Sequence, residues 1–446
     1  MSLVYYNFKK DDYMKNKQTF AKSLIEFIDK SPTSFHATKN VEEELINSGF
    51  KKINLQDKWN LEKEGKYYII KNNSAIIGFQ IGNGEIEEDG FKIVGAHTDA
   101  PTFKIKPNPE MTVENKYLKL NTEVYGGPIM STWYDRPLSI AGRVSIKTDN
   151  PLRPKELLID MEKPMLIIPN LAIHMNRSVN DGVKINPQIE TLPLLSNIND
   201  KFEKENFIVE LIAEKLHVEI EDILDFELFL YGVEKGSLVG FNEEFISVGR
   251  LDDLAMVHAG LNGIIESKAS KATNILVCFD NEEVGSGTKQ GAASPMLRTV
   301  LERIALAMNK DKEDYYRALS NSFIISADQA HALHPNYVDK QDPTNRPVIN
   351  GGPAIKFAAN QAYTTDSFSS AVYEGICKSI DIPVQKYANR SDARGGSTIG
   401  PISSSQLDIA SVDIGNPILG MHSIRELGGV EDHFNVYKLF KEFYRI

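Results

Sequence analysis

Cysteine is scarce in this sequence, with only Cys278 and Cys377 among 446 residues. Two cysteines cannot build a disulfide framework or a zinc site of several thiolates, and this usage is typical of a reducing compartment, so we expect the cytoplasm. Basic residues are also outnumbered, because 50 Lys and Arg stand against 61 Asp and Glu and leave a formal net charge of −11. Nucleic-acid binding relies on Lys and Arg that neutralise phosphates, so we expect no nucleic-acid partner.

Long hydrophobic runs are missing as well. The most apolar windows, residues 164–173 and 273–279, are much shorter than the roughly 18 residues that a membrane helix needs. Lys9 and Lys10 occur before an apolar stretch of the signal-peptide type develops. We therefore expect neither a membrane span nor export through a signal peptide.

The sequence does contain an alternation of helical and strand patterns. Phe20, Leu24, Phe27 and Ile28 recur at helical spacing and predict a helix over residues 16–30. Later, apolar β-branched runs alternate with helical ones, which favours an α/β fold with helices on both faces of a sheet. The expected strands are 67–70, 75–81, 91–96, 273–279, 322–327, 383–387 and 408–414, and the further helices are 254–267, 295–308, 366–380 and 436–444.

The middle of the chain has a different texture. Its length allows two or three domains, and residues 106–245 are β-rich and interrupted by proline, with one clear helix at 207–216 and a polar loop at 197–206. We interpret this stretch as an inserted domain. The remaining domain would then be discontinuous and comprise residues 1–105 and 246–446.

Five segments carry metal-competent or acid/base residues, several of them where expected strands end. An open α/β sheet presents its ligand site at such strand ends. Read from the sequence, the segments are His97 to Asp99, Asp252 with Asp253, Asp280 to Glu283, Asp328 to His334, and His422 to Glu426.

Each segment also has a purely structural explanation. His97, His331 and His334 could be ordinary hydrogen-bonded histidines, and Asp252 or Asp253 could cap a helix. The adjacent Glu282 and Glu283 are less easily explained, because two neighbouring carboxylates at a sheet edge repel each other unless a cation or a proton compensates.

Taken together, the segments supply histidine and carboxylate ligands without thiolates, a set that suits zinc or a similar divalent ion. Because there are more carboxylates than one tetrahedral ion needs, a two-metal site with one bridging Asp is a natural interpretation. A Glu that is not a ligand would serve as general base. This pattern describes metal-assisted hydrolysis.

The same segments resemble the signature blocks of the aspartyl aminopeptidase family of metallopeptidases, in family order from about residue 20 to the C-terminus. The blocks are Gly-Ala-His97-Thr-Asp99-Ala-Pro, Arg250-Leu251-Asp252, Asp280-Asn-Glu282-Glu283-Val-Gly-Ser, Ser326-Ala-Asp328 and Gly-Met421-His422-Ser-Ile-Arg-Glu, with further matches at 168–177, 352–356 and 396–401.

The resemblance implies a catalytic α/β domain with a central mixed sheet flanked by helices, interrupted by a β-rich oligomerisation domain, and assembly into tetrahedral dodecamers. It implies two Zn²⁺ ions per subunit, with Co²⁺ or Mn²⁺ as substitutes. His97 and Asp328 would ligate one ion, Glu283 and His422 the other, and Asp252 would bridge them.

Further roles follow from the same resemblance. Glu282 would be the general base that takes a proton from the attacking water and passes it to the leaving amine, and Asp99 would orient His97. His174 would reach from the inserted domain into a neighbouring subunit's active site, although a buried strand histidine is the alternative. Lys356 would face an acidic N-terminal side chain of the substrate, unless it is an exposed strand lysine.

Ser397 and Thr398 match the family's substrate-binding loop. Two positions depart from the family pattern. Asp253 stands where the eukaryotic enzymes have Asn, and the segment Arg394-Gly395-Gly396 before Ser397 differs from the usual family sequence. Both departures concern the substrate pocket and not the metals.

We therefore expect a metalloaminopeptidase that releases N-terminal residues, Asp or Glu foremost, from peptides. A metallo-deacylase or carboxypeptidase on a related sheet is the alternative within enzymes. A catalytically silent assembly protein is the alternative outside them, but such a protein should have lost one of the metal or base residues, and none is missing.

Overall fold

A computed structural model describes residues 2–182, 184–198, 206–393 and 395–446, with side chains described from residue 16 onward. Most of the polar loop predicted at 197–206, and Arg394, lie outside the described residues. The chain divides into unit 1 (residues 1–99, 236–421 and 426–446) and unit 2 (residues 100–235 and 422–425). The predicted boundary at residue 105 lies six residues beyond the end of unit 1's first segment. The predicted boundary at residue 245 lies ten residues beyond the end of unit 2's main segment.

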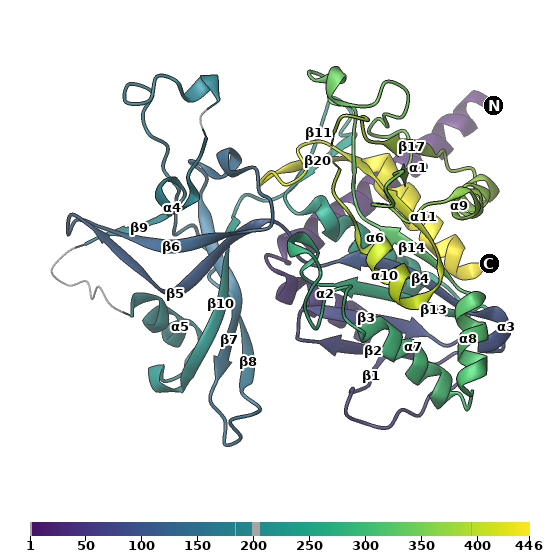
Figure 1. The fold of residues 1–446 in the computed structure, drawn as a ribbon. Helices are drawn as coiled ribbons and strands as arrows, with labels where there is room; N and C mark the ends of the chain where they lie inside the picture. The colour runs from purple at the N-terminus through teal and green to yellow at the C-terminus, as the bar shows by residue number, and fades with distance from the viewer. Residues whose placement is uncertain (1, 183, 199–205, 394) are drawn as a thin grey trace. The chain divides into compact units, whose positions relative to one another are not determined.

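Unit 1 is built on a nine-stranded mixed sheet (Figure 1). In spatial order its strands are β1 (Lys51–Lys52), β2 (Lys66–Lys71), β3 (Ala75–Gln80), β13 (Thr273–Phe279), β4 (Phe91–His97), β14 (Phe323–Ala327), β18 (Ala410–Gly415), β16 (Ala354–Phe357) and β17 (Gln385–Ala388). The central strands β13, β4, β14 and β18 are parallel to one another, and β3 and β16 flank them in antiparallel pairing. The carboxyl ends of the four central strands therefore meet at one edge.

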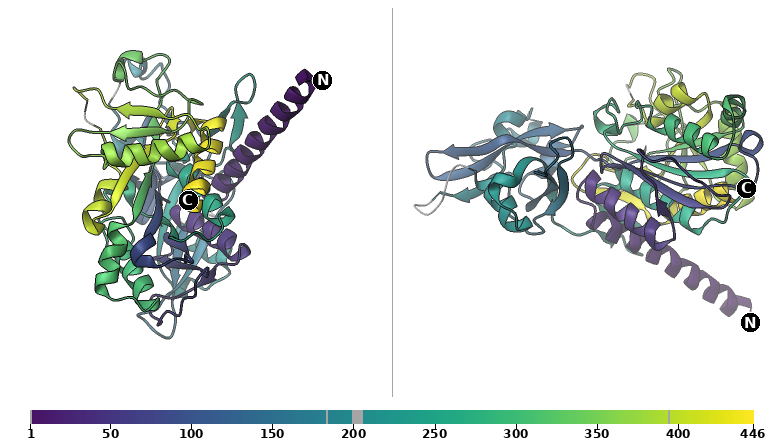
Figure 2. Two further views of the ribbon diagram at one scale, coloured as in Figure 1. Left: turned by 90° about the vertical axis from the view of Figure 1, so that its right-hand side faces the viewer. Right: turned by 90° about the horizontal axis from the view of Figure 1, so that it is seen from below.

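Helices cover both faces of this sheet (Figure 2), as the sequence predicted. One face packs on α1 (Ser2–Asp29), α2 (Ser34–Asn47), α6 (Leu251–Glu266), α9 (Ser367–Ser379) and α11 (Val430–Arg445). The other face packs on α3 (Ile86–Asp89), α7 (Met296–Ala307), α8 (Lys312–Ser320) and α10 (Ile399–Leu407). The α/β class with a mixed sheet flanked by helices is thus confirmed.

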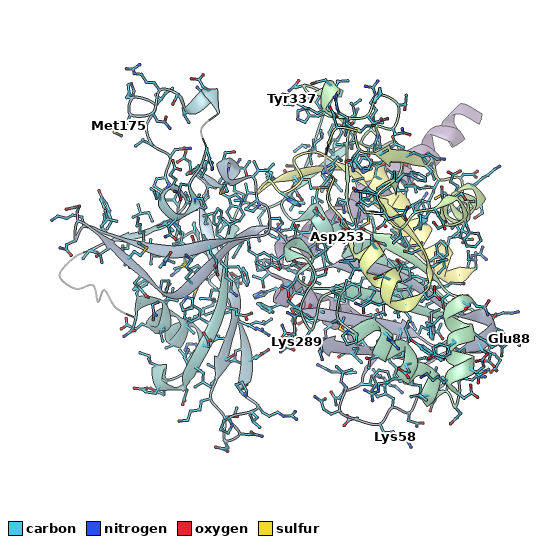
Figure 3. All side chains as sticks on the ribbon, viewed as in Figure 1. Lys58, Glu88, Met175, Asp253, Lys289 and Tyr337 are labelled. Atoms are coloured by element: carbon cyan, nitrogen blue, oxygen red, sulfur yellow. The ribbon has the colours of Figure 1, made fainter. Side chains whose placement is uncertain are left out.

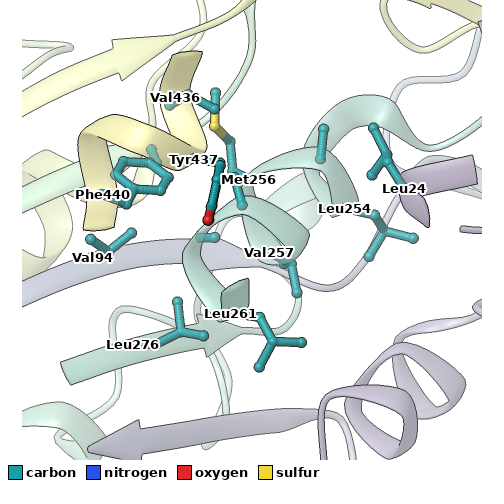
Figure 4. Packing of buried hydrophobic residues seen from close by; sticks show 14 of the residues in the cluster. Leu24, Val94, Leu254, Met256, Val257, Leu261, Leu276, Val436, Tyr437 and Phe440 are labelled. Carbon is teal, nitrogen blue, oxygen red and sulfur yellow. The ribbon is translucent and has the colours of Figure 1, made fainter. Parts of the chain in front are cut away.

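Alternation along the strands explains the two layers. Val94 and Leu276 point into the first cluster, whereas their neighbours Ile93 and Ile275 point into the second. All four are buried, because a central strand covered on both faces is apolar at every position. Figure 4 shows how α6 and α11 pack together over β4 and β13.

Several boundaries differ from those predicted. Strand 273–279 and helix 207–216 are found with the predicted ends, but the helix predicted at 436–444 begins at Val430, and α2, α8 and α10 were not anticipated. A local signal for α8 was present, since Asp311 and Asp314 form a capping box at its start. In the described residues, no helix is both long enough and apolar enough to cross a membrane.

Unit 2 contains a six-stranded antiparallel sheet in the order β8 (Lys155–Asp160), β7 (Leu138–Ile146), β10 (Ile223–Gly232), β5 (Thr102–Val113), β6 (Tyr117–Tyr125) and β9 (Leu194–Asn197). Helices α4 (Pro187–Glu190) and α5 (Phe207–Leu216) belong to it. Its core includes Phe103, Trp133 and Leu228. Unit 2 therefore has a hydrophobic cluster of its own, as an independent domain requires.

A pair of buried histidines joins three helices of unit 1. His258 Nδ1 on α6 lies 3.0 Å from His433 Nε2 on α11, and His258 Nε2 lies 3.3 Å from Ser23 Oγ on α1. The ring of Phe20 stacks on His433. Burial lowers the pKa of His258 to about 3, and it lowers the pKa of His433 well below its usual value. Both rings are therefore neutral in the folded protein at pH 7.

We expect acid to weaken this junction. Because the pKa of His258 is about 3 when folded and about 6.5 when unfolded, the unfolded chain takes up the proton first. Stability is then present above pH 6.5 and lost as the pH falls toward 3. Between pH 7.5 and pH 5, the free energy of unfolding should fall by about 2 kcal/mol more in the wild type than in His258→Phe. Urea titrations at the two pH values measure this, and equal losses would contradict it.

Candidate metal centre and active site

The candidate site of unit 1 lies where its parallel central strands end. Phe279, the last residue of β13, pairs with His97, the last residue of β4, and β14 pairs with β4 on the other side. After β13, Asn281 adopts a left-handed backbone with φ of +61° that turns the chain into the short 3-10 helix Glu282–Val284. Asp328 directly follows β14. The local chain direction thus delivers all these side chains to one edge of the sheet.

His97 lies at the centre of a group of carboxylates. The residue is only 1% exposed. Its Nε2 lies 3.4 Å from Asp252 Oδ1 and 3.9 Å from Asp328 Oδ1. Its Nδ1 lies 3.3 Å from Asp99 Oδ1 and 3.1 Å from the Asp99 carbonyl oxygen. One ring nitrogen thus faces the acids of other elements while Asp99 holds the other, the usual arrangement of a metal-ligating histidine.

Asp99 also fixes the segment that carries the two glutamates. Its buried carboxylate accepts hydrogen bonds from the backbone N–H groups of Glu282, at 3.1 Å, and Glu283, at 3.2 Å. The same side chain therefore orients His97 and anchors the turn after β13.

Asp252 and Asp253 stand at the start of α6, where their backbone dihedral angles are not helical. The N-cap residue is Arg250, and its side chain makes no capping bond. The carboxylate of Asp253 instead accepts from the backbone N–H of His97 at 3.1 Å and from Gln329 Nε2 at 3.4 Å. The backbone N–H of Asp252 donates to Glu426 Oε2 at 3.1 Å. The Asp253 carboxylate and the Asp252 backbone are thus tied to neighbouring segments of the chain.

The side chains of unit 1 form two groups that could hold an ion. Ligand atoms of His97, Asp252, Asp253 and Asp328 all lie within 4.8 Å of one another, and so do those of His97, Glu282 and Glu283. Imidazole nitrogen with carboxylate oxygens is a donor set that zinc accepts. The residues present around His97 therefore fit a zinc site. Figure 3 labels Asp253, which lies at this site in unit 1.

The electrostatics of the site favour added positive charge. Burial raises the pKa of Glu282 to about 7; His97 opposes this shift, and Asp328, Asp252 and Asp99 add to it. Burial lowers the pKa of His97, but its hydrogen bonds to carboxylates outweigh burial and raise it well above its usual value. Burial likewise raises the pKa of Asp253 well above its usual value. Crowded acids of this kind bind a proton or a cation readily.

Lys356 lies beside this group and is only 3% exposed. Its Nζ donates to Asp328 Oδ2 at 3.2 Å and lies 5.5 Å from the centre of the Tyr363 ring. Burial lowers the pKa of Lys356, but Asp328 and other nearby groups outweigh it, so the net shift is upward. The alternative of an exposed strand lysine is therefore wrong.

Ser397 and Thr398 precede α10 in unit 1. Ser397 is exposed, and its Oγ donates to the carbonyl oxygen of Ala362 at 3.3 Å. Thr398 is buried, and its Oγ1 donates to Asp413 Oδ1 at 2.6 Å. The two adjacent hydroxyls therefore point to different partners, and only that of Ser397 lies on an exposed residue.

The two remaining predicted histidines belong to unit 2. His422 has φ of +68°, and its Nδ1 lies 3.0 Å from the Gly127 carbonyl oxygen. His174 is exposed in a turn, so the alternative of a buried strand histidine is wrong. The roles of both residues at the metal site stay predictions. His331 is exposed and His334 half-buried, and neither joins a metal-competent group within the described residues.

Sequence reasoning missed Asp413, which is fully buried in β18 and accepts four hydrogen bonds. A signal was available, because Asp413 is an acid inside a mostly apolar strand, and such a residue must have partners in the interior. Its neighbours could not be read from the sequence, because they come from three distant segments.

Comparison with known proteins gives consistent matches along most of the chain. A family described as "Aminopeptidase I zinc metalloprotease (M18)" matches residues 27–444. The "Probable M18 family aminopeptidase 2" of Clostridium novyi (strain NT) is 61% identical over 433 residues, which are 97% of this chain and 100% of the relative.

Two solved structures illustrate the likeness in fold. The "Cryo-EM structure of the Ape4 and Nbr1 complex" has a TM-score of 0.92 and 34% identity and covers 96% of this chain and 86% of that chain. The "Structure of S. cerevesiae mApe1 dodecamer" has a TM-score of 0.84 and 28% identity and covers 96% of this chain and 97% of that chain.

Proposed function

Because this chain belongs to the M18 family of zinc metalloproteases and is an aminopeptidase, we propose that it releases N-terminal Asp or Glu residues from peptides with Glu282 as general base. The observation that carries the proposal is the cluster of unit 1, in which buried His97 faces Asp252 and Asp328 while Glu282 follows the neighbouring strand.

We further propose two zinc ions per subunit. His97 and Asp328 would hold one ion, Glu283 and His422 the other, and Asp252 would bridge them, and Co²⁺ or Mn²⁺ could replace zinc. When bound, the ions would polarise the scissile carbonyl and acidify the attacking water. The presence of more carboxylates within 4.8 Å of His97 than one ion requires supports this number.

Glu282 would move the proton in this reaction. Its backbone is held by Asp99, so its carboxylate stays at the strand end while it accepts a proton from the attacking water and donates it to the leaving amine. Burial raises the pKa of Glu282, which favours the protonated form that donates to the leaving amine. Asp252 and Glu283 would add the negative charge that attracts the free amine of the substrate.

Lys356 would supply the preference for acidic residues. A buried ammonium attracts a carboxylate more strongly than one in water. The pairing of Lys356 with Asp328 means that it would also balance charge at the metal site. Ser397 and Thr398 would bound the same pocket.

The substrate preference is open to direct measurement. We expect kcat/KM for Asp- and Glu-anilides to exceed that for Leu- and Lys-anilides by about tenfold or more, because one charge pair in a partly buried site contributes on this scale. In Lys356→Met, the ratio of these kcat/KM values should fall to about one. Lys386 is an exposed lysine of the adjacent strand β17, and Lys386→Met should preserve the ratio. A preference for Leu or Lys would overturn the acidic specificity.

Free and N-acetylated peptides with a free carboxyl terminus separate the alternative reactions. N-acetylated substrates should not be cleaved by an aminopeptidase, whereas a metallo-deacylase would cleave them and a carboxypeptidase would ignore N-terminal blocking. Complete inactivity of the zinc-loaded protein would favour a silent assembly protein.

We propose that the chain forms a homo-oligomer, namely a tetrahedral dodecamer, and that it works in the cytoplasm. One similar solved structure is described as a dodecamer. In unit 2, a loop carries large exposed apolar side chains: Leu171 is 54% exposed and Ile173 52%. Met175, labelled in Figure 3, is 71% exposed. Exposed apolar residues gathered in one segment are typical of a contact with another protein.

His174 lies within this loop, and we propose that it completes the active site of a neighbouring subunit. His174→Ala and Glu282→Gln subunits should each have only a small residual activity, but mixed oligomers should recover part of the activity, because some sites would receive an intact residue of each kind. Activity of mixtures, with mixing verified by mass spectrometry, is the measurement. No recovery in verified mixed oligomers would contradict the role of His174.

A further inference from the structure

The buried carboxylate of Asp413 connects three segments that border the site in unit 1. Its Oδ1 accepts from Ser326 Oγ and from Thr398 Oγ1, each at 2.6 Å. Its Oδ2 accepts from the backbone N–H of Thr364 at 2.6 Å and from Thr364 Oγ1 at 2.8 Å. Its own backbone N–H donates to Thr365 Oγ1 at 3.0 Å. Four donors on one buried carboxylate make a network that a neutral side chain cannot reproduce.

Asp413 is also a cross-strand neighbour of Lys356. Its strand β18 lies between β14 and β16, and Ser326 of β14 is its partner in parallel pairing. In the antiparallel pairing with β16, Ile355 lies opposite Ile414, so the same register sets Lys356 opposite Asp413. Opposite residues of paired strands point to one face, where opposite charges attract each other. Asp413 is accordingly one of the groups that raise the pKa of Lys356.

Each segment joined by Asp413 leads to a residue of the proposed pocket. Ser326 stands two residues before Asp328. Thr364 follows Tyr363, whose ring lies beside the Lys356 ammonium. Thr398 begins α10. The segments around Lys356 are therefore held together by the carboxylate of Asp413. Among the described contacts, none is a hydrogen bond between this carboxylate and the Lys356 ammonium.

We propose that Asp413 is a positioning residue for substrate specificity, because it holds the Thr364 segment and the start of α10 around Lys356. This inference rests on the proposed role of Lys356 in recognising acidic N-terminal residues. Asp413 acts through Lys356 and its neighbours and touches no reacting atom.

The test compares Asp413→Asn with single-donor variants in the zinc-loaded protein. Asn has nearly the same size as Asp, but one of its two polar atoms is an amide N–H₂ that cannot accept a hydrogen bond. The hydroxyl or backbone donors on that side of residue 413 would therefore lose their acceptor. We expect kcat/KM for an Asp-anilide to fall about tenfold more than for a Leu-anilide, chiefly through KM, as for one lost charge-assisted hydrogen bond. Thr364→Val should act in the same direction, and Thr364→Ser should restore the ratio.

A second measurement does not use activity. Lys356 is buried and should react slowly with acetic anhydride, and its acetylation, followed by peptide mass spectrometry, should become severalfold faster in Asp413→Asn. Thr38→Val is the control, because it makes the same substitution at a buried threonine on α2, and it should change neither the substrate ratio nor the acetylation rate.

The outcomes separate this inference from the specificity it rests on. If Asp413→Asn lowers kcat/KM equally for both anilides and leaves the acetylation rate of Lys356 unchanged, the role of Asp413 is purely structural and the inference is overturned. If the wild type has no acidic preference but acetylation still rises in Asp413→Asn, the role of Lys356 fails while the positioning by Asp413 holds. If Asp413→Asn does not fold, Thr364→Val and Thr364→Ser decide by the same two measurements.

Discussion

Replacing Glu282 by Gln should lower kcat by about three orders of magnitude, within the range of 10²–10⁴ that general-base catalysis contributes. The amide has nearly the same size as the carboxylate but cannot accept a proton from water. The zinc content should stay at the wild-type level, because Glu282 is proposed as the base and not as a ligand. Steady-state kinetics on an Asp-anilide, with metal analysis of the same sample, measure both.

The matched control is Glu88→Gln, an exposed glutamate of α3 (Figure 3), which should leave kcat unchanged. A kcat within tenfold of the wild type in Glu282→Gln would contradict the assignment, and loss of zinc would move Glu282 into the ligand set.

The pH profile gives this prediction a second readout. Burial raises the pKa of Glu282 to about 7 in the protein without metal, and bound cations lower it, because positive charge favours the ionised form. A base acts only when ionised, so wild-type kcat/KM should fall as the pH drops through a pKa at or below 7. The residual activity of Glu282→Gln should lack this acid limb.

The second large effect concerns Asp252. In Asp252→Asn, the proposed bridge between the two ions loses a negatively charged ligand, so we expect fewer than two zinc ions per chain. Activity should fall by at least about a thousandfold, because Lewis-acid stabilisation by a bound metal contributes several kcal/mol. Elemental analysis after gel filtration and the anilide assay measure the two quantities.

The adjacent Asp253 supplies a demanding control. Its Oδ2 accepts from the backbone N–H of His97 at 3.1 Å and its Oδ1 accepts from Gln329 Nε2 at 3.4 Å. The amide oxygen of Asn can keep the shorter of these two bonds, and burial raises the pKa of Asp253 and so favours its neutral form. Asp253→Asn should therefore retain both ions and most of the activity. If Asp253→Asn lost zinc and Asp252→Asn did not, the bridging role would belong to Asp253.

Much of the fold could be predicted because the spacing of apolar residues along the sequence indicates helices and strands locally. The strand Thr273–Phe279 and the helix Phe207–Leu216 have the predicted ends, since an unbroken apolar run or a helical repeat bounded by polar residues leaves few alternatives. Helix α10 was missed because Gly400, Pro401 and three serines give it a weak helical pattern. Its helical state depends on packing against the sheet, through Ile399 and Leu407.

The candidate site divides in the same way. Residues at strand ends were identified because parallel strands bring their carboxyl ends to one edge. The ion pair of Lys356 with Asp328 and the network around Asp413 were not, because they join residues that are far apart in the chain and meet only through strand order and register.

The sequence by itself therefore determined the α/β class, the family blocks and the acids that precede or follow its strands. Two cysteines excluded a zinc site of several thiolates, and a net charge of −11 argued against a polyanion partner, but neither told which of the 61 acids matter. Only the tertiary structure decided that Asp252, Asp253, Asp328 and Asp413 are held around His97 and Lys356. The reason is physical: burial and mutual distance, which set the charge and the chemistry of a carboxylate, arise from long-range packing and have no local pattern.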